Sequence, residues 1–164
     1  MKIIVKRIIS LFVALTSVVT IINYPNDSLA YIPSSVTATY QNKIVEKAQS
    51  YLGVPYVWGG SSHSEIDCSG LTMNVYSEAG VNGSLPHDAA SQYSSTNGYY
   101  LPNSSVTGAI AFRSKTGQIS NITHCAVRVN HTSGTFIHAP KPGYSVCYTS
   151  SSFSWFTSPS SWLF

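Results

Sequence analysis

The segment over residues 59–71 places the strongest constraint on how this chain folds, because a glycine-rich polar loop changes there abruptly into a segment of helical periodicity. The change falls at Asp67-Cys68-Ser69-Gly70, and aspartate is a favoured N-cap residue. The apolar residues that define the helix are Leu71, Val75 and Ala79, and Gly80 follows as a stop. Cys68 is therefore expected in the first helical turn, where unpaired backbone N–H groups and the helix dipole favour a thiolate.

Two downstream histidines, His124 and His138, each lie in a short strand-like run and could supply a base and its orienting partner to Cys68. A lone cysteine is more often inert than catalytic, and a lone histidine is more often a surface or structural residue. We apply that plain interpretation to the other three histidines, which lie in loops or at helix starts: His63, His87 and His131. His124 and His138 differ because a candidate thiolate and a predicted hairpin accompany them.

The N-terminus is expected to be an export signal over residues 1–30. Three cationic residues precede a mostly apolar run over 8–22, and Ser28-Leu29-Ala30 resembles a cleavage site. The apolar run is shorter than the roughly 20 residues that span a bilayer, so we expect cleavage and no stable membrane span. Residues 31–39 are predicted to be a loose leader, and residues 40–164 a single catalytic domain.

The charge balance argues against nucleic acid as a partner. Three of the nine basic residues and one of the six acidic residues lie in the signal, which leaves a formal charge of +1 without any basic patch. No Cys-x-x-Cys or His-Glu-x-x-His pattern indicates a metal, and we expect no cofactor. The composition, with few charges and many hydroxyl and amide side chains, fits an extracellular protein, which we expect to be a monomer. The leading interpretation is a secreted cysteine hydrolase.

The periodicity changes from helical to strand-like along the chain, which predicts an α+β fold. A helix through Ile44, Val45, Ala48 and Leu52 should end at Gly53, and a third helix should begin at Leu85-Pro86 and end at Asn97-Gly98. Strands are predicted over 109–112, 125–129, 135–139 and 145–148. Part of the aromatic tail after residue 149 should pack on the sheet.

The predicted turns place the histidines and the remaining cysteines. A turn centred on His131 puts His124 directly opposite His138 on one face, about 4.5–5.5 Å apart at Cβ. A turn centred on Pro142 places Cys147 beside Ile137, which itself faces Cys125. Both cysteines then lie on the face of the sheet opposite the histidines. Their predicted separation of about 9.5 Å exceeds the roughly 7 Å limit for a disulfide. We therefore expect two buried apolar thiols and a free Cys68.

Several spaced motifs occur in order between residues 42 and 148. They are Leu52-Gly53-Val54-Pro55-Tyr56-Val57-Trp58-Gly59-Gly60, Asp67-Cys68-Ser69-Gly70-Leu71, Leu85-Pro86-His87, Gln92, His124 and Phe136-Ile137-His138-Ala139-Pro140. Together these blocks resemble the NlpC-type peptidoglycan peptidases. The resemblance implies a papain-like core, with N-terminal helices packed on a C-terminal antiparallel sheet. It also implies a cell-wall-associated enzyme that cleaves peptidoglycan stem peptides between D-glutamate and the diamino acid.

Carried over by position, the resemblance implies that Cys68 is the nucleophile, His124 the base and His138 the residue that orients His124. Tyr56 matches a tyrosine near the nucleophile in the family and is a candidate donor to the oxyanion, and Trp58 in the same motif is a candidate substrate contact. Asp67 and Ser69 match positions that in some members contact the free amine of the stem peptide. For Asp67 the plain role of helix cap is an equal alternative.

The chain departs from the family pattern at two places. Thr107-Gly108-Ala109 replaces the usual Pro-Gly-Asp, and the aromatic tail replaces the usual closing strand with its arginines. An inactive homologue that binds wall or surface glycans through aromatic residues is one alternative, with candidate contacts at Tyr56, Trp58, Tyr99, Tyr100 and the tail. An amidase, transpeptidase, acyltransferase or toxin-like effector with the same trio is another, because the trio does not fix the acyl acceptor.

Overall fold

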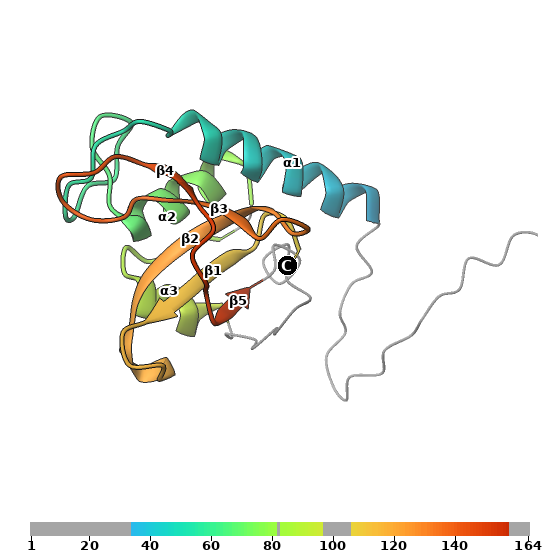
Figure 1. Ribbon diagram of the computed structural model, residues 1–164. Helices are drawn as coiled ribbons and strands as arrows, with labels where there is room; N and C mark the ends of the chain where they lie inside the picture. The colour runs from blue at the N-terminus through green and yellow to red at the C-terminus, as the bar shows by residue number, and fades with distance from the viewer. Residues whose placement is uncertain (1–33, 82, 97–105, 158–164) are drawn as a thin grey trace, which may run out of the picture. The chain divides into compact units, whose positions relative to one another are not determined.

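The computed structural model describes residues 34–81, 83–96 and 106–157, and its helices precede its strands along the chain (Figure 1). The helices are α1 (Ser34–Ser50), α2 (Cys68–Glu78) and α3 (Ala89–Ser95), with a short 3-10 turn η2 (Ile119–Asn121). The strands are β1 (Ile110–Ser114), β2 (Ile122–Asn130), β3 (Thr135–His138), β4 (Cys147–Thr149) and β5 (Trp155–Thr157). They form one antiparallel sheet in the order β4-β3-β2-β1-β5, which confirms the predicted α+β class.

The alternation of side chains along each strand builds two apolar layers, one on each face of the sheet. Phe112, Val127 and Ile137 belong to the larger layer, which also contains the buried residues of the helices. The neighbouring positions point the other way into a smaller layer of Ala111, Ala126, Phe136, Phe153 and Phe156. The pairing of β5 with β1 confirms that part of the aromatic tail packs on the sheet.

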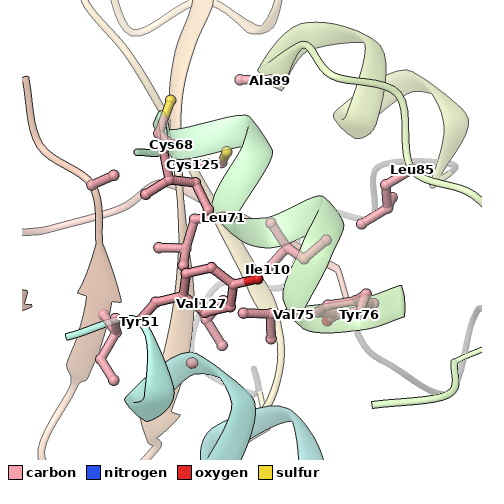
Figure 2. Packing of buried hydrophobic residues seen from close by; sticks show 14 of the residues in the cluster. Tyr51, Cys68, Leu71, Val75, Tyr76, Leu85, Ala89, Ile110, Cys125 and Val127 are labelled. Carbon is pink, nitrogen blue, oxygen red and sulfur yellow. The ribbon is translucent and has the colours of Figure 1, made fainter. Parts of the chain in front are cut away.

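Helix α2 lies against β2 and carries the residues that the helical periodicity predicted to be buried. Leu71 and Val75 are fully buried, and Figure 2 shows them packed with Ile110 and Val127 of the sheet. Each such side chain contributes about 1.5–3 kcal/mol when buried. Because α1 and α3 also contact β2, the start of α2 is held against the centre of the sheet.

Three local expectations need correction. The helix α1 begins at Ser34 and includes most of the predicted leader, because no glycine or proline interrupts residues 34–52. It ends at Ser50, so Leu52 is partly exposed and Tyr51 is buried in its place. Helix α3 begins at Ala89 rather than at Leu85-Pro86, because the Asp88 carboxylate caps it by accepting from Ser91 N at 2.7 Å.

The β2–β3 register differs from the predicted one by two residues. Val127 pairs with Ile137 and Arg128 with Phe136, and an irregularity follows before Asn130. The turn is longer than predicted because the Asn130 side chain accepts from Thr132 N and Ser133 N. A shift of two residues keeps every side chain on its predicted face, so His124 and His138 still share a face but lie diagonally.

The β3–β4 register differs by one residue, and this reverses the predicted orientation of Cys147. His138 pairs with Cys147, which is exposed, so the prediction of a buried Cys147 beside Ile137 is wrong. The cause lies in the preceding segment, where Val146 is buried and exchanges backbone hydrogen bonds with residues 53–54. Cys125 is buried as predicted, and all three cysteines are free.

Within the described ranges, no helix is long and apolar enough to cross a membrane. The predicted signal peptide, the predicted end of the third helix at Asn97-Gly98, and Tyr99 and Tyr100 lie outside the described residues.

Candidate active site

Cys68 is the first residue of α2, as the sequence predicted, and Asp67 is its N-cap. The Asp67 Oδ1 atom accepts from Gly70 N at 2.7 Å and from Ser69 Oγ at 2.9 Å. The other carboxylate oxygen, Oδ2, accepts from Gly59 N at 2.9 Å, which ties the glycine-rich loop to the helix start. Burial raises the pKa of Asp67, but the hydrogen bonds from these groups and His87 outweigh it, so the net pKa is lowered.

Two glycines permit close backbone contacts here, one between the loop and the helix and one within the loop. A Cβ atom on Gly70 would collide with the backbone carbonyl oxygen of Gly60, which itself accepts from Asp67 N at 3.0 Å. A Cβ atom on Gly60 would meet the backbone of Glu65 and Ile66 at 2.9 Å. Gly70 therefore permits the contact between the helix start and the loop backbone, and Gly60 permits the loop to pack against its own residues 65–66.

The Cys68 thiol is almost fully buried, at 8% exposure, and two groups favour its ionised form. A hydrogen bond from Cys125 is the largest influence, and the hydrogen bond and charge of His124 act in the same direction against the effect of burial. Together they lower the pKa of Cys68 to about 5. Burial and the neighbouring Cys68 raise the pKa of Cys125, so Cys125 stays a thiol and donates. Figure 2 shows both sulfur atoms near the first turn of α2.

His124 on β2 and His138 on β3 are both buried and joined by a hydrogen bond of 2.9 Å between His124 Nε2 and His138 Nδ1. Burial, together with the positive charges of His124 and Arg113, lowers the pKa of His138 to about 4. His138 is therefore neutral near pH 7, and its Nδ1 accepts the Nε2–H of His124. This leaves His124 Nδ1 for Cys68.

Tyr56 and Trp58 lie in the loop before the nucleophile but differ in exposure. Tyr56 is buried, and burial together with the charges of Cys68 and Asp67 raises its pKa to about 12. Its hydroxyl therefore keeps its proton and can donate a hydrogen bond. Trp58 is 82% exposed, so its ring is available to a ligand.

An open cleft of about 810 Å³ connects these groups, and this volume falls in the usual range for ligand sites. It brings together all the predicted site residues except His138: Tyr56, Trp58, Asp67, Cys68, Ser69 and His124. Basic side chains also line it, from Arg113, Lys115 and Lys141. The cleft therefore offers a nucleophile, a base and groups of both charges.

Sequence reasoning missed four residues that support the site. His87, interpreted from the sequence as a surface or structural residue, is hydrogen-bonded to Asp67 Oδ1 at 2.9 Å and lines the cleft. Gln92 belongs to the family motifs, but the sequence assigned it no role. It is fully buried and donates to Ser69 O at 2.9 Å. Cys125 was predicted to be buried but not to contact the nucleophile, and Phe153 was not assigned to the site at all. The Leu85-Pro86-His87 block was the only available signal for His87.

The interpretation of His63 and His131 as surface or structural residues agrees with the geometry. His63 is exposed, stacks on Tyr51 with ring centroids 4.0 Å apart, and bonds to Glu78 at 3.0 Å. His131 is exposed in the β2–β3 turn. Neither lines the cleft.

Known proteins are similar to this chain in sequence. Gamma-D-glutamyl-L-lysine dipeptidyl-peptidase from Bacillus subtilis (strain 168) is 30% identical over 115 residues, which cover 70% of this chain and 37% of that protein. Protein P54 from Enterococcus faecium is 34% identical over 107 residues, which cover 63% of this chain and 19% of that protein. This chain therefore matches less than two fifths of the length of these relatives.

Solved structures agree in fold. The crystal structure of the NlpC/p60 domain of peptidoglycan hydrolase SagA matches with a TM-score of 0.61 and 30% identity, covering 72% of this chain and 97% of that chain. The peptidoglycan hydrolase RipB from Mycobacterium tuberculosis matches with a TM-score of 0.61 at 22% identity, which shows the fold alone. It covers 83% of this chain and 73% of that chain.

The NlpC/P60 family model matches residues 53–158, which include the loop, the cysteine helix and the whole sheet. The resemblance found in the sequence blocks is thereby confirmed, and this chain belongs to the NlpC/P60 family.

Proposed function

We propose that this chain is a secreted cysteine peptidase that hydrolyses bacterial peptidoglycan stem peptides at the bond between D-glutamate and the diamino acid. One observation carries the proposal: the pKa of Cys68 is lowered to about 5 beside His124, whose ring is held by His138. The names of related proteins as peptidoglycan hydrolases and a glutamyl-lysine peptidase support the substrate class. The N-terminal sequence pattern supports export.

In the first half-reaction, the Cys68 thiolate attacks the carbonyl carbon of the scissile amide, and a C–S bond forms. His124 carries the proton and donates it from Nδ1 to the nitrogen of the departing amine as the C–N bond breaks. His138 accepts the Nε2–H of His124 and so fixes which nitrogen faces the substrate. The products are a thioester on Cys68 and a free amine.

The oxyanion that forms during the attack needs donors that do not ionise. The Cys68 backbone N–H lies at the first helical position, where no intrahelical acceptor exists. The Tyr56 hydroxyl is a second donor, because its raised pKa keeps it protonated. Loss of one such donor typically lowers kcat about 100- to 1,000-fold.

In the second half-reaction, water attacks the thioester carbonyl while neutral His124 removes its proton. The C–S bond breaks, the acyl group leaves as a carboxylic acid, and the Cys68 thiolate and protonated His124 are restored. No metal or cofactor takes part in this scheme.

The substrate would lie along the cleft between groups of opposite charge. Asp67 and Ser69 at one side are the candidate contacts for the free amine of the stem peptide. The Asp67 carboxylate already accepts four hydrogen bonds, so the helix-cap role is present whether or not the amine binds there. Exposed Trp58, which also lines the cleft, offers an apolar surface to the peptide.

Digestion of defined muropeptides, with the products weighed by mass spectrometry, tests the proposal. Cleavage between D-glutamate and the diamino acid is expected, and Cys68→Ala should abolish it. Release at the amide between the glycan and the peptide would replace the peptidase by an amidase. Products joined to an added amine would instead indicate a transpeptidase or acyltransferase. Binding of peptidoglycan without any cleavage would support the inactive glycan-binding alternative.

The two histidines are expected to contribute unequally. His124→Ala should lower kcat by about 100- to 10,000-fold, because it removes the proton carrier. His138→Asn keeps an acceptor for the Nε2–H of His124 and should retain measurable activity. Thermal melts establish that each variant is folded. The assignment of roles fails if folded His124→Ala cuts as fast as the wild type, or if His138→Asn is as inactive as Cys68→Ala.

A further inference from the structure

Phe153 lies on the face of the sheet away from the helices, and its ring packs against the candidate base. It belongs to the smaller apolar layer and is buried. Its ring stacks on His124, with centroids 6.0 Å apart and planes inclined by 23°. On another side it contacts Phe136 of β3, at a centroid distance of 4.6 Å. Phe153 therefore joins the two strands that carry His124 and His138.

Arg113 of β1 adds to this wall around the histidines. Its guanidinium carbon lies 5.6 Å from the Phe153 ring centroid, a cation–π distance. Arg113 also pairs with His124 across the β1–β2 ladder. The Phe153 ring therefore packs between the His124 ring and the Arg113 guanidinium, and it contacts both of them.

The strand β5 holds Phe153 in place. Ser154 N donates to Phe112 O at 3.1 Å, and Trp155 pairs with Phe112. The Trp155 ring points to the opposite face, where it contacts Tyr93 at a centroid distance of 6.5 Å. The aromatic segment that departs from the family pattern is thus anchored on both faces of the sheet.

We propose that Phe153 is a positioning residue of the candidate active site, which holds the His124 ring in the plane that serves both Cys68 and His138. This proposal depends on the proposed function only where its test measures the cleavage of a muropeptide. A hydrogen bond at Nε2 fixes one point of the ring but leaves rotation about that bond, and the stacked Phe153 ring blocks this rotation. Misplacement of a catalytic group by about 1 Å can lower the rate about 100-fold.

The Phe153 ring covers His124, which is hydrogen-bonded to His138, so we expect it also to limit the access of water to this pair. The groups that face His138 from neighbouring elements in the described structure are His124 on β2, Arg113 on β1 and Cys147 on β4. Burial is the largest cause of the lowered pKa of His138. Removal of the Phe153 ring would admit water, and the pKa of His138 would then rise from about 4 toward its usual value.

Phe156 provides a matched control in the same apolar layer. It is buried to the same degree as Phe153, and its ring contacts in the described structure are with Phe136 and Arg128. Phe156→Leu and Phe153→Leu therefore remove equivalent apolar surface, but only Phe153→Leu removes a ring that touches His124. Phe153→Tyr retains that ring.

The experiment compares these three variants in thermal melts, in kcat and KM on a muropeptide, and in the pH titration of His138 by NMR. Phe153→Leu should lower kcat about 10- to 100-fold with little change in KM, and should raise the titration midpoint of His138. Phe156→Leu should lower the melting temperature comparably while leaving kcat and that midpoint near the wild type. Phe153→Tyr should recover most of kcat.

Two results would overturn the proposal: equal losses of kcat in Phe153→Leu and Phe156→Leu, or an unchanged kcat and His138 titration in Phe153→Leu. If the wild type cleaves no muropeptide, the proposed function fails separately. The His138 titration and the alkylation rate of Cys68 then decide the role of Phe153 alone, because neither needs a substrate. Unchanged values in Phe153→Leu would refute the positioning role.

Discussion

Replacement of Asp67 by alanine should destabilise the protein far more than an ordinary N-cap substitution. The Asp67 carboxylate caps α2 through Gly70 N, binds the buried Ser69 hydroxyl and holds the loop through Gly59 N. It also bonds to His87, which joins the segment before α3 to the same point. One side chain therefore connects three segments around the candidate nucleophile.

The magnitude follows from these partners. Loss of the cap costs about 1 kcal/mol, and the buried Ser69 hydroxyl left without an acceptor adds about 1–3 kcal/mol. We expect Asp67→Ala to lower the free energy of unfolding by about 3 kcal/mol in total. With a urea dependence of about 1–3 kcal/mol per molar, the unfolding midpoint should fall by about 1–3 M.

Asp88→Ala is the matched control, because Asp88 also caps a helix but is exposed. Its carboxylate accepts from Ser91 N, and loss of that cap should cost about 1 kcal/mol or less. Urea unfolding followed by circular dichroism measures both variants. If Asp67→Ala costs no more than Asp88→Ala, the bonds to Ser69, Gly59 and His87 contribute nothing measurable, and the reasoning is refuted.

The same comparison has a definite pH dependence. The pKa of Asp67 is lowered on folding, so the ionised carboxylate stabilises the folded state above the unfolded value of about 3.9. That stabilisation is lost as the pH falls through the folded pKa. The difference in stability between the wild type and Asp67→Ala should therefore be largest near pH 7 and shrink below about pH 4. A difference that grows on acidification would contradict the assignment.

Two further predictions concern the thiols and the glycine contact. Brief iodoacetamide treatment near pH 6 should label Cys68 before the exposed Cys147, because the pKa of Cys68 is about 5. The buried Cys125 should react only after unfolding. Equal labelling of the three cysteines in a mass map would exclude an activated Cys68. Gly70→Ala should lower both stability and Cys68 reactivity, because its Cβ would collide with the Gly60 carbonyl oxygen and push the loop from the helix. A variant with wild-type melting temperature and labelling rate would show that the contact relaxes freely.

Features that depend on local physics could be predicted from the amino-acid sequence alone. The N-cap at Asp67, the helix with buried Leu71 and Val75, and the later change to strand periodicity all follow from residues close together in the chain. The alternation of side chains between the two faces of a strand is equally local. His124 and His138 are therefore correctly predicted to share a face, although the predicted register is wrong by two residues.

The contacts between residues that are distant in the chain became known from the three-dimensional packing. The burial of Val146 against the loop at residues 53–54 turned Cys147 outward, and no pattern within β4 itself could indicate that. The contacts of Cys125 with Cys68, of His87 with Asp67 and of Phe153 with His124 depend in the same way on packing. Local propensity fixes the type of an element and the face on which a side chain lies. Turn length and the competition for buried positions set its register, and thus its neighbours across the sheet.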